Sequence, residues 1–265
     1  MFETALTATA PDGTELVYYD SGGDGPPVVL VHGITEQAAG WAPIAEALRA
    51  THRVVALDLR GHGASGTAES YDLGAMAGDV IAVITAAGLD APHIVGHSLG
   101  GVVVSAVGAV YPVASVVCVD QALNLGAFQE ALVPIGPMLR DPDTFPVVIE
   151  QLFAELAGPL DGPERARVDG LRRADQTVVL GIWELILTSD LDDIGATVDT
   201  ALEPYAAAST PYLALFGVDP GDDYPAWLTA RIPTATVETW ADHGHYPQLI
   251  DPDRFVARVR DFWGS

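Results

Sequence analysis

A serine stands between two glycines in the segment Gly96-His97-Ser98-Leu99-Gly100, where an apolar run typical of a strand passes into a run typical of a helix. Such a serine lies in a sharp turn, which is tolerable only where neighbouring residues lack side chains, and the two glycines meet that condition. The hydroxyl then stands clear of the sheet, and the free N–H groups of the helix point toward any oxygen that approaches it. This is the arrangement that nucleophilic catalysis by Ser98 needs.

The serine needs a sheet and a helix to position it, and the periodicity of the chain predicts both. Strands are predicted at 26–33, 52–59, 91–98, 114–120, 210–217 and 235–241, and helices at 40–50, 73–88, 99–112, 224–232 and 251–263. This alternation indicates a mostly parallel sheet that is flanked by helices on both faces. An antiparallel hairpin is predicted ahead of these elements, with its turn at Pro11-Asp12-Gly13.

The alternation of strands and helices stops after Asp120 and resumes near residue 210. Residues 121–209 are acidic and helical in character, are interrupted by several prolines and contain no convincing strand. We therefore expect an α/β core built from residues 1–120 and 210–265. Residues 121–209 would form a helical cap, inserted after the sixth strand.

Four segments resemble motifs of the α/β-hydrolase family, in the order in which that family has them. The G-x-S-x-G pattern at 96–100 resembles the family's nucleophile turn. LVHGITE at 30–36 and DLRGHGAS at 58–65 resemble its loops after the third and fourth strands, and DHGHYPQLIDPDRF at 242–255 resembles its histidine loop. The resemblance covers nearly the whole chain and implies the α/β-hydrolase fold with a serine hydrolase site.

The resemblance also implies roles for individual residues. His245, in the histidine loop, would accept the proton of Ser98, and the backbone N–H groups of Ile34 and Leu99 would form the oxyanion hole. The implied reaction is hydrolysis of a carboxylic ester, lactone or thioester through an acyl-enzyme, without a cofactor. A carbon–carbon bond hydrolase, a biosynthetic tailoring enzyme and a non-catalytic small-molecule receptor remain alternatives.

The acid partner of His245 is left open. The commonest family pattern has an aspartate three residues after the glycine that ends the seventh strand, but Pro220 occupies that position here. Some family members carry the acid at the end of the sixth strand, where this chain has Asp120. We expect Asp120, with Asp219 as the alternate acid, and the remaining alternatives in the same loop are Asp222 and Asp223.

The cap would supply most of the substrate pocket. The substrate-binding candidates are Trp41, His97, Phe128 and Trp183, and the other apolar candidates in the cap are Met138, Phe145, Phe153 and Leu187. Such a wall suits a hydrophobic acyl or alcohol group. The expected substrate is therefore small and largely apolar.

The charge of the chain limits its partners. The formal net charge is −24, from 36 acidic and 12 basic residues, and every basic residue is an arginine. Such a surface repels nucleic acid and anionic membranes, so neither partner is expected. The expected partner is a small-molecule substrate, and a homodimer is left open.

The remaining features indicate a cytoplasmic protein without a metal. No apolar run is long enough to cross a membrane, and no signal peptide is evident at the start of the sequence. The single cysteine, Cys118, lies in an apolar run that predicts a buried, inert thiol. No pair of histidines has zinc-type helical spacing.

Overall fold

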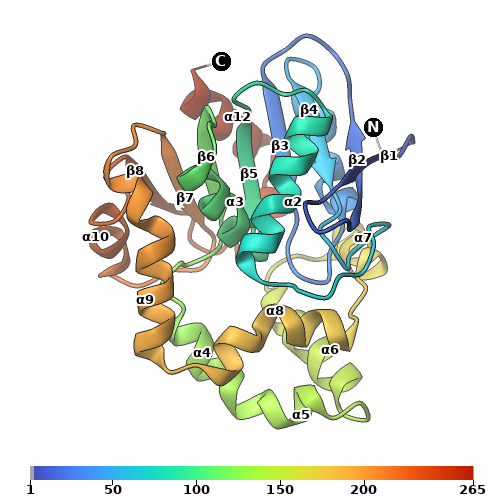
Figure 1. Cartoon of the computed structure of the whole chain (residues 1–265), viewed down its shortest axis with the longest axis vertical. Helices are drawn as coiled ribbons and strands as arrows, with labels where there is room; N and C mark the ends of the chain where they lie inside the picture. The colour runs from blue at the N-terminus through green and yellow to red at the C-terminus, as the bar shows by residue number, and fades with distance from the viewer. Residues whose placement is uncertain (1–2, 265) are drawn as a thin grey trace.

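The computed structural model describes residues 3–264 and contains an eight-stranded sheet in the order β1-β2-β4-β3-β5-β6-β7-β8 (Figure 1). The strands are β1 (Leu6–Thr9), β2 (Glu15–Asp20), β3 (Pro27–Val31), β4 (Arg53–Leu57), β5 (His93–His97), β6 (Ser115–Val119), β7 (Tyr212–Phe216) and β8 (Ala235–Thr239). The β1–β2 and β2–β4 pairs are antiparallel, and the pairs from β4 through β8 are parallel. The mostly parallel sheet predicted from the sequence is confirmed.

Helices cover both faces of the sheet. Helices α2 (Leu73–Ala86) and α3 (Leu99–Val110) pack on one face, and α1 (Ala42–Leu48) and α12 (Pro252–Trp263) pack on the other (Figure 1). In β3, Val29 and Val31 belong to the first of these cores, whereas Val28 and Leu30 belong to the second. Because side chains alternate along a strand, a strand buried on both faces reads as a continuous apolar run. This explains why β3 was recognisable in the sequence.

The parallel register brings the carboxyl ends of the strands together. Val31 of β3 pairs with Gly96 of β5, and His97 of β5 pairs with Val119 of β6. The loops after β3, β5 and β6 therefore leave the sheet at one edge. This is the edge at which open α/β sheets bind ligands.

The segment between β6 and β7 is helical. It contains α4 (Gly126–Leu132), η2 (Val133–Ile135), α5 (Gly136–Arg140), α6 (Phe145–Leu156), α7 (Gly162–Leu171), α8 (Gln176–Thr188), α9 (Leu191–Leu202) and η3 (Glu203–Ala206). Prolines in the first turns of α5, α6 and α7 fit there because those positions need no backbone donor. The segment has its own apolar core, which includes Phe153 and Trp183 and also contacts Ile34. Figure 1 shows α4, α5, α6 and α8 below the sheet, across its carboxyl edge.

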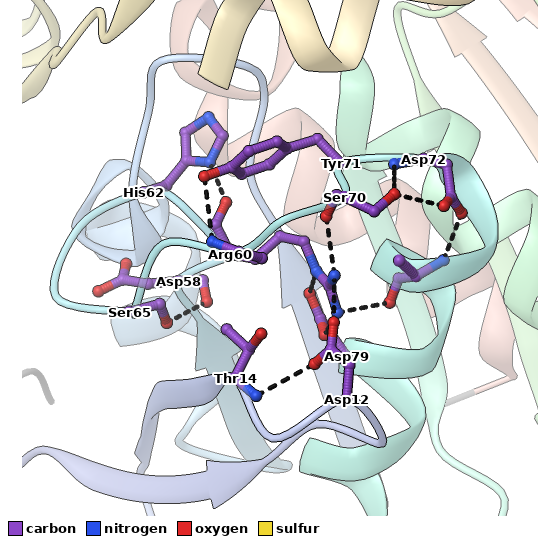
Figure 2. Close-up of polar contacts among 12 residues, drawn as sticks. Asp12, Thr14, Asp58, Arg60, His62, Ser65, Ser70, Tyr71, Asp72 and Asp79 are labelled. Atoms are coloured by element: carbon purple, nitrogen blue, oxygen red, sulfur yellow. Dashed lines mark hydrogen bonds and ion pairs between the residues drawn. The ribbon is translucent and has the colours of Figure 1, made fainter. Parts of the chain in front are cut away.

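A buried ion pair fixes the loop after β4. The Arg60 guanidinium donates to both carboxylate oxygens of Asp79 in α2, at 2.7 and 2.6 Å, and also to Asp12 at 2.8 Å (Figure 2). The carbonyl oxygens of Ser70 and Ala75 accept its remaining donors, at 2.9 and 3.3 Å. All five N–H donors of this buried guanidinium thus have partners, which a buried charge requires.

The remaining elements are short. They are η1 (Ala38–Trp41), α10 (Tyr224–Thr229) and α11 (Pro247–Ile250). No helix within residues 3–264 is long and apolar enough to span a membrane.

Candidate active site

Ser98 occupies the turn between β5 and α3. Its backbone has φ 52° and ψ −122°, a left-handed conformation that is strained for a residue with a side chain. A Cβ atom at Gly96 would lie 2.0 Å from the carbonyl oxygen of Gly100, and one at Gly100 would lie 2.3 Å from the carbonyl oxygen of Val31. Only glycine fits at either position, so the two glycines permit the turn that presents Ser98.

Asp120 and His245 meet at the carboxyl edge of the sheet. Oδ2 of Asp120 lies 2.7 Å from Nδ1 of His245. The other carboxylate oxygen accepts the backbone N–H groups of Gly217 at 2.7 Å and Val218 at 3.0 Å. Asp120 has φ 47° and directly follows β6. The strained backbone and three hydrogen bonds fix the carboxylate against the imidazole.

A close backbone contact brings the histidine loop to β7. A Cβ atom at Gly217 would lie 2.0 Å from the carbonyl oxygen of Gly244, the residue before His245. The end of β7 and the histidine loop can therefore approach only because residue 217 is a glycine. This contact carries His245 to Asp120.

The electrostatics suit a neutral imidazole beside an ionised carboxylate. Burial would raise the pKa of Asp120, but the His245 hydrogen bond and the N–H groups of Val218 and Gly217 hold it below its ordinary value. Burial lowers the pKa of His245, and the charge of nearby His97 lowers it further, against the opposing effect of Asp120. With its Nδ1–H donated to Asp120, His245 has Nε2 available to accept a proton.

The alternate acids are not hydrogen-bonded to His245, although Asp219 lines the same cavity as His245. Oδ1 of Asp219 accepts the N–H of Gly221 at 2.9 Å in an exposed loop, and Asp222 and Asp223 are also exposed. Of the four acids considered from the sequence, Asp120 is the one hydrogen-bonded to His245.

In the loop after β3, a hydrogen bond from His32 fixes the direction of the peptide group between Gly33 and Ile34. Nε2 of His32 accepts the N–H of Leu59 at 3.0 Å, so the ring proton is on Nδ1, which donates to the carbonyl oxygen of Gly33 at 2.7 Å. Burial lowers the pKa of His32 to about 4, which keeps this ring neutral. In a trans peptide the C=O and N–H point in opposite directions, so holding the Gly33 carbonyl orients the N–H of Ile34.

A cavity of about 830 Å³ connects these groups. Ser98, Asp120, His245, Ile34 and Leu99 all line it. Leu99 is the first residue of α3, where a backbone N–H has no acceptor within the helix. The nucleophile, base and N–H candidates are thus gathered around one space.

The helical segment between β6 and β7 forms much of the cavity wall. Phe128 and Trp183 line the cavity, with their rings edge to face at 5.8 Å, and Phe153 lies beside them. Of the other apolar candidates in this segment, Met138 is exposed, whereas Phe145 and Leu187 pack in the core of the helical segment.

Two of the predicted substrate-binding residues, Trp41 and His97, do not line this cavity. Trp41 is 2% exposed and packs against Phe255 of α12, in the core between the sheet and helices α1 and α12. The 3₁₀ turn η1 directs its ring into the core. His97 is 1% exposed and is held by Glu36 and by the backbone of His245, so it does not reach the cavity.

Sequence reasoning missed Glu36 and Arg172. Glu36 is an acidic residue five positions after a fully buried strand, which is a signal that could have drawn attention to it. Arg172 follows α7 and has no distinguishing pattern in the sequence. Both belong to a polar network behind the cavity. Elsewhere in the described residues, no group of three or more histidine, cysteine or acidic side chains is arranged to hold a metal ion.

Comparison with known proteins agrees with this architecture. Residues 28–258 match the alpha/beta hydrolase family. The chain is 30% identical over 264 residues to the dihydrolipoyllysine-residue acetyltransferase component of the acetoin cleaving system of Cupriavidus necator, covering 96% of this chain and 68% of that protein. It is 34% identical over 169 residues to protein phosphatase methylesterase 1 of Mus musculus, covering 60% of this chain and 44% of that protein.

Solved structures give the same result. The esterase RhEst1 from Rhodococcus sp. ECU1013 superposes with a TM-score of 0.71 at 29% identity over 98% of each chain. The esterase EaEST from Exiguobacterium antarcticum has a TM-score of 0.81 at 18% identity, over 99% of this chain and 100% of that one, a likeness in fold alone. The chain belongs to the alpha/beta hydrolase family, and the family match, the methylesterase relative and the esterase RhEst1 support hydrolase activity.

Proposed function

We propose that the protein is a serine hydrolase that cleaves a carboxylic ester of a small, uncharged and largely apolar substrate. Ser98 is the nucleophile, His245 the general base and Asp120 the acid that orients His245. The observation that carries the proposal is the 2.7 Å hydrogen bond from His245 to Asp120, at a cavity that Ser98 also lines.

The proposed reaction has two halves. In the first, Oγ of Ser98 bonds to the ester carbonyl carbon while its proton moves to Nε2 of His245. The tetrahedral intermediate then collapses, the ester C–O bond breaks, and His245 returns the proton to the departing alcohol. In the second half, water attacks the acyl-enzyme in the same way, which releases the carboxylic acid and restores Ser98.

The negative oxygen of each tetrahedral intermediate needs hydrogen-bond donors that are already in place. We assign this role to the N–H groups of Ile34 and Leu99. The first is oriented by the His32 hydrogen bond to the Gly33 carbonyl, and the second begins α3. Neither donor has to reorganise during the reaction.

The cavity supports the proposed substrate class. Its wall is mostly apolar, and its charged residues are Asp72, Asp120, Glu184 and Asp219, with no arginine among the described lining residues. An anionic substrate would find no cation there to pair with. Burying an unpaired carboxylate costs several kcal/mol, on the order of a hundredfold or more in binding.

We further propose that α4 through α9 act as a cap over a core built from residues 1–120 and 210–265. The cap's contributions to the cavity wall, among them Phe128 and Trp183, support this division.

A fluorophosphonate probe tests the proposal, because it labels only an activated serine. Intact mass should show one adduct on the wild type and none on Ser98→Ala. The wild type should also hydrolyse p-nitrophenyl butyrate, and Ser98→Ala should not. A folded wild type that forms no adduct and hydrolyses no ester would refute the proposal and favour a receptor.

Two neighbouring histidines supply a matched control. His245→Gln should abolish labelling and turnover. His243→Gln should leave both intact, because the His243 ring bonds only to the Ala241 carbonyl oxygen, at 3.0 Å. Equal activity in the two variants would exclude His245 as the base.

A further inference from the structure

A second polar network lies behind the cavity, centred on the carboxylate of Glu36. Oε1 of Glu36 accepts the hydroxyl proton of Tyr246 at 2.8 Å, and Oε2 accepts the N–H of Gly33 at 3.2 Å. Oε2 also lies 3.4 Å from Nδ1 of His97. The Glu36 side chain is 13% exposed. The largely buried carboxylate of Glu36 therefore contacts Gly33 in the loop after β3, Tyr246 in the histidine loop, and His97, which precedes Ser98.

The direction of each hydrogen bond in this network is determined. Nη2 of Arg172 lies 2.9 Å from the Tyr246 hydroxyl, and a guanidinium can only donate. The single hydroxyl proton of Tyr246 must then go to Glu36. Since the N–H of Gly33 can also only donate, both oxygens of Glu36 are acceptors. These hydrogen bonds and the nearby charge of Arg172 favour the ionised form of Glu36.

The same reasoning gives the charge of His97. Its Nε2 lies 2.7 Å from the carbonyl oxygen of His245, which can only accept. Its Nδ1 faces the ionised Glu36, which also can only accept. Both ring nitrogens thus carry protons, and the ring is an imidazolium.

The surrounding charges are balanced around this imidazolium. His97 faces Glu36 from the loop after β3, the rings of His245 and Tyr246 at 4.6 and 4.9 Å, and the more distant Asp120. His32, also nearby, is neutral. With Arg172 on the far side of Tyr246, two positive groups oppose two carboxylates.

The pKa directions agree with the geometry. Burial would lower the pKa of His97, but Glu36 and the His245 carbonyl outweigh it and raise the pKa above its ordinary value. Burial would raise the pKa of Glu36, but His97, Arg172 and Tyr246 hold it far below its ordinary value.

We propose that Glu36 and His97 form a permanent buried ion pair that positions the loop after β3 and the backbone of His245. Arg172, the residue after α7, holds this pair in place through its hydrogen bond to Tyr246. The proposal rests on the proposed serine hydrolase function. None of the three residues lines the main cavity, so each acts through other groups.

Arg172 connects the pair to the cavity wall. Its guanidinium donates to the Tyr246 hydroxyl and, at 2.8 Å, to Oγ1 of Thr35, the residue after Ile34. It also stacks over the ring of Phe153, with its Cζ 4.0 Å from the ring centroid. Thr35 has φ 64°, a conformation that needs support from its surroundings. Arg172 thus joins a wall residue to the loop that carries the Ile34 N–H.

The charge of His97 is tested first, without any enzyme assay. In protein labelled with ¹⁵N-histidine, both ring nitrogens of His97 should still report protons above the ordinary histidine pKa of about 6.5. The spectrum of Glu36→Gln should show His97 titrating at lower pH. A wild-type His97 ring that loses its second proton at or below the ordinary histidine pKa of about 6.5 would overturn the ion pair.

The positioning role is tested by kinetics on p-nitrophenyl butyrate. Glu36→Gln is nearly isosteric but has one acceptor oxygen in place of two, so kcat should fall about ten- to a hundredfold while KM changes less than about twofold. Arg172→Gln should act in the same direction. Arg173→Gln is the matched control, since Arg173 is exposed and its side chain bonds only to the carbonyls of Gly170 and Arg172.

The pH profile separates positioning from general loss of structure. In His97→Gln the positive charge beside His245 is gone and Glu36 remains, so the acid limb of kcat/KM should move to higher pH by about half to one unit. Folded variants with wild-type kcat and an unmoved acid limb would overturn the positioning role. A wild type without esterase activity would instead refute the proposed function, and the ¹⁵N spectra would still decide the ion pair.

Discussion

The carboxylate of Asp120 lies 2.7 Å from Nδ1 of His245, although 125 residues separate the two in the sequence. The backbone N–H groups of Gly217 and Val218 hold the other oxygen of Asp120, so the carboxylate cannot rotate away without losing both hydrogen bonds. The base and its acid therefore form one rigid unit across the ends of β6 and β7.

Asp120→Asn should reduce kcat about 10³- to 10⁴-fold, because an amide in this position favours the wrong tautomer of His245. The fold should be retained, since the amide oxygen can still accept the N–H groups of Gly217 and Val218. Steady-state turnover of p-nitrophenyl butyrate and a thermal melt measure the two effects. Asp219→Asn is the control and should keep near wild-type turnover, and the reverse pattern would transfer the role to Asp219.

The acid limb of the pH profile should lie below 6.5, the ordinary histidine pKa. Only neutral His245 can accept the Ser98 proton, and burial together with the His97 charge lowers its pKa, so the base stays neutral to lower pH than a free histidine. Activity is present above this pKa and lost as the pH falls through it. The measurement is kcat/KM against pH, and an acid limb well above 6.5 would contradict the assigned direction.

Uncharged esters should be strongly preferred over anionic ones. The matched probes are p-nitrophenyl butyrate and a p-nitrophenyl ester of similar length whose acyl chain ends in a free carboxylate. We expect kcat/KM to be about a hundredfold lower for the anionic probe, because the described residues of the cavity lining include four acidic side chains and no arginine. Equal rates for the two probes would show that the charged end remains in water.

The ion pair between Arg60 and Asp79 should be the most sensitive polar contact in the core. Both side chains are buried, so Asp79→Asn removes the only buried counter-ion of the guanidinium among the described residues, leaves it with the half-exposed Asp12, and should lower the free energy of unfolding by about 3 kcal/mol. Asp12→Asn is the control. The Asp12 side chain is 45% exposed, and the loss of its charge should change the free energy of unfolding far less than Asp79→Asn does. Urea unfolding of the three proteins compares them, and equal stabilities would refute the prediction.

The sheet could be predicted from the sequence because its strands are buried on both faces. β3 and β6 contain uninterrupted apolar runs of four residues, 28–31 and 116–119, and the strand after each crossover must lie parallel to the strand before it. The position of Ser98 followed from the same logic, since a glycine on each side marks a turn that tolerates no Cβ atom.

The choice of acid could not be settled from the sequence, because Asp120 and Asp219 both follow strands that end at the same edge. The decision depends on the φ of 47° at Asp120 and on the N–H groups that hold its carboxylate, which no pattern of residue types encodes. Trp41 and His97 were misplaced for a related reason. Both lie close in sequence to the site, but both rings are buried in the interior, Trp41 at the end of η1 and His97 at the end of β5.

The use of Asp120 leaves the loop after β7 with no catalytic duty in the proposed mechanism. Val218 holds the Asp120 carboxylate, but residues 219–223 beyond it still border the cavity through Asp219 and Pro220, and most of them are exposed. Substitutions and insertions there can reshape the entrance while the reacting groups stay in place. This loop is therefore where substrate preference can diverge among relatives, and where it can be re-engineered, independently of the chemistry.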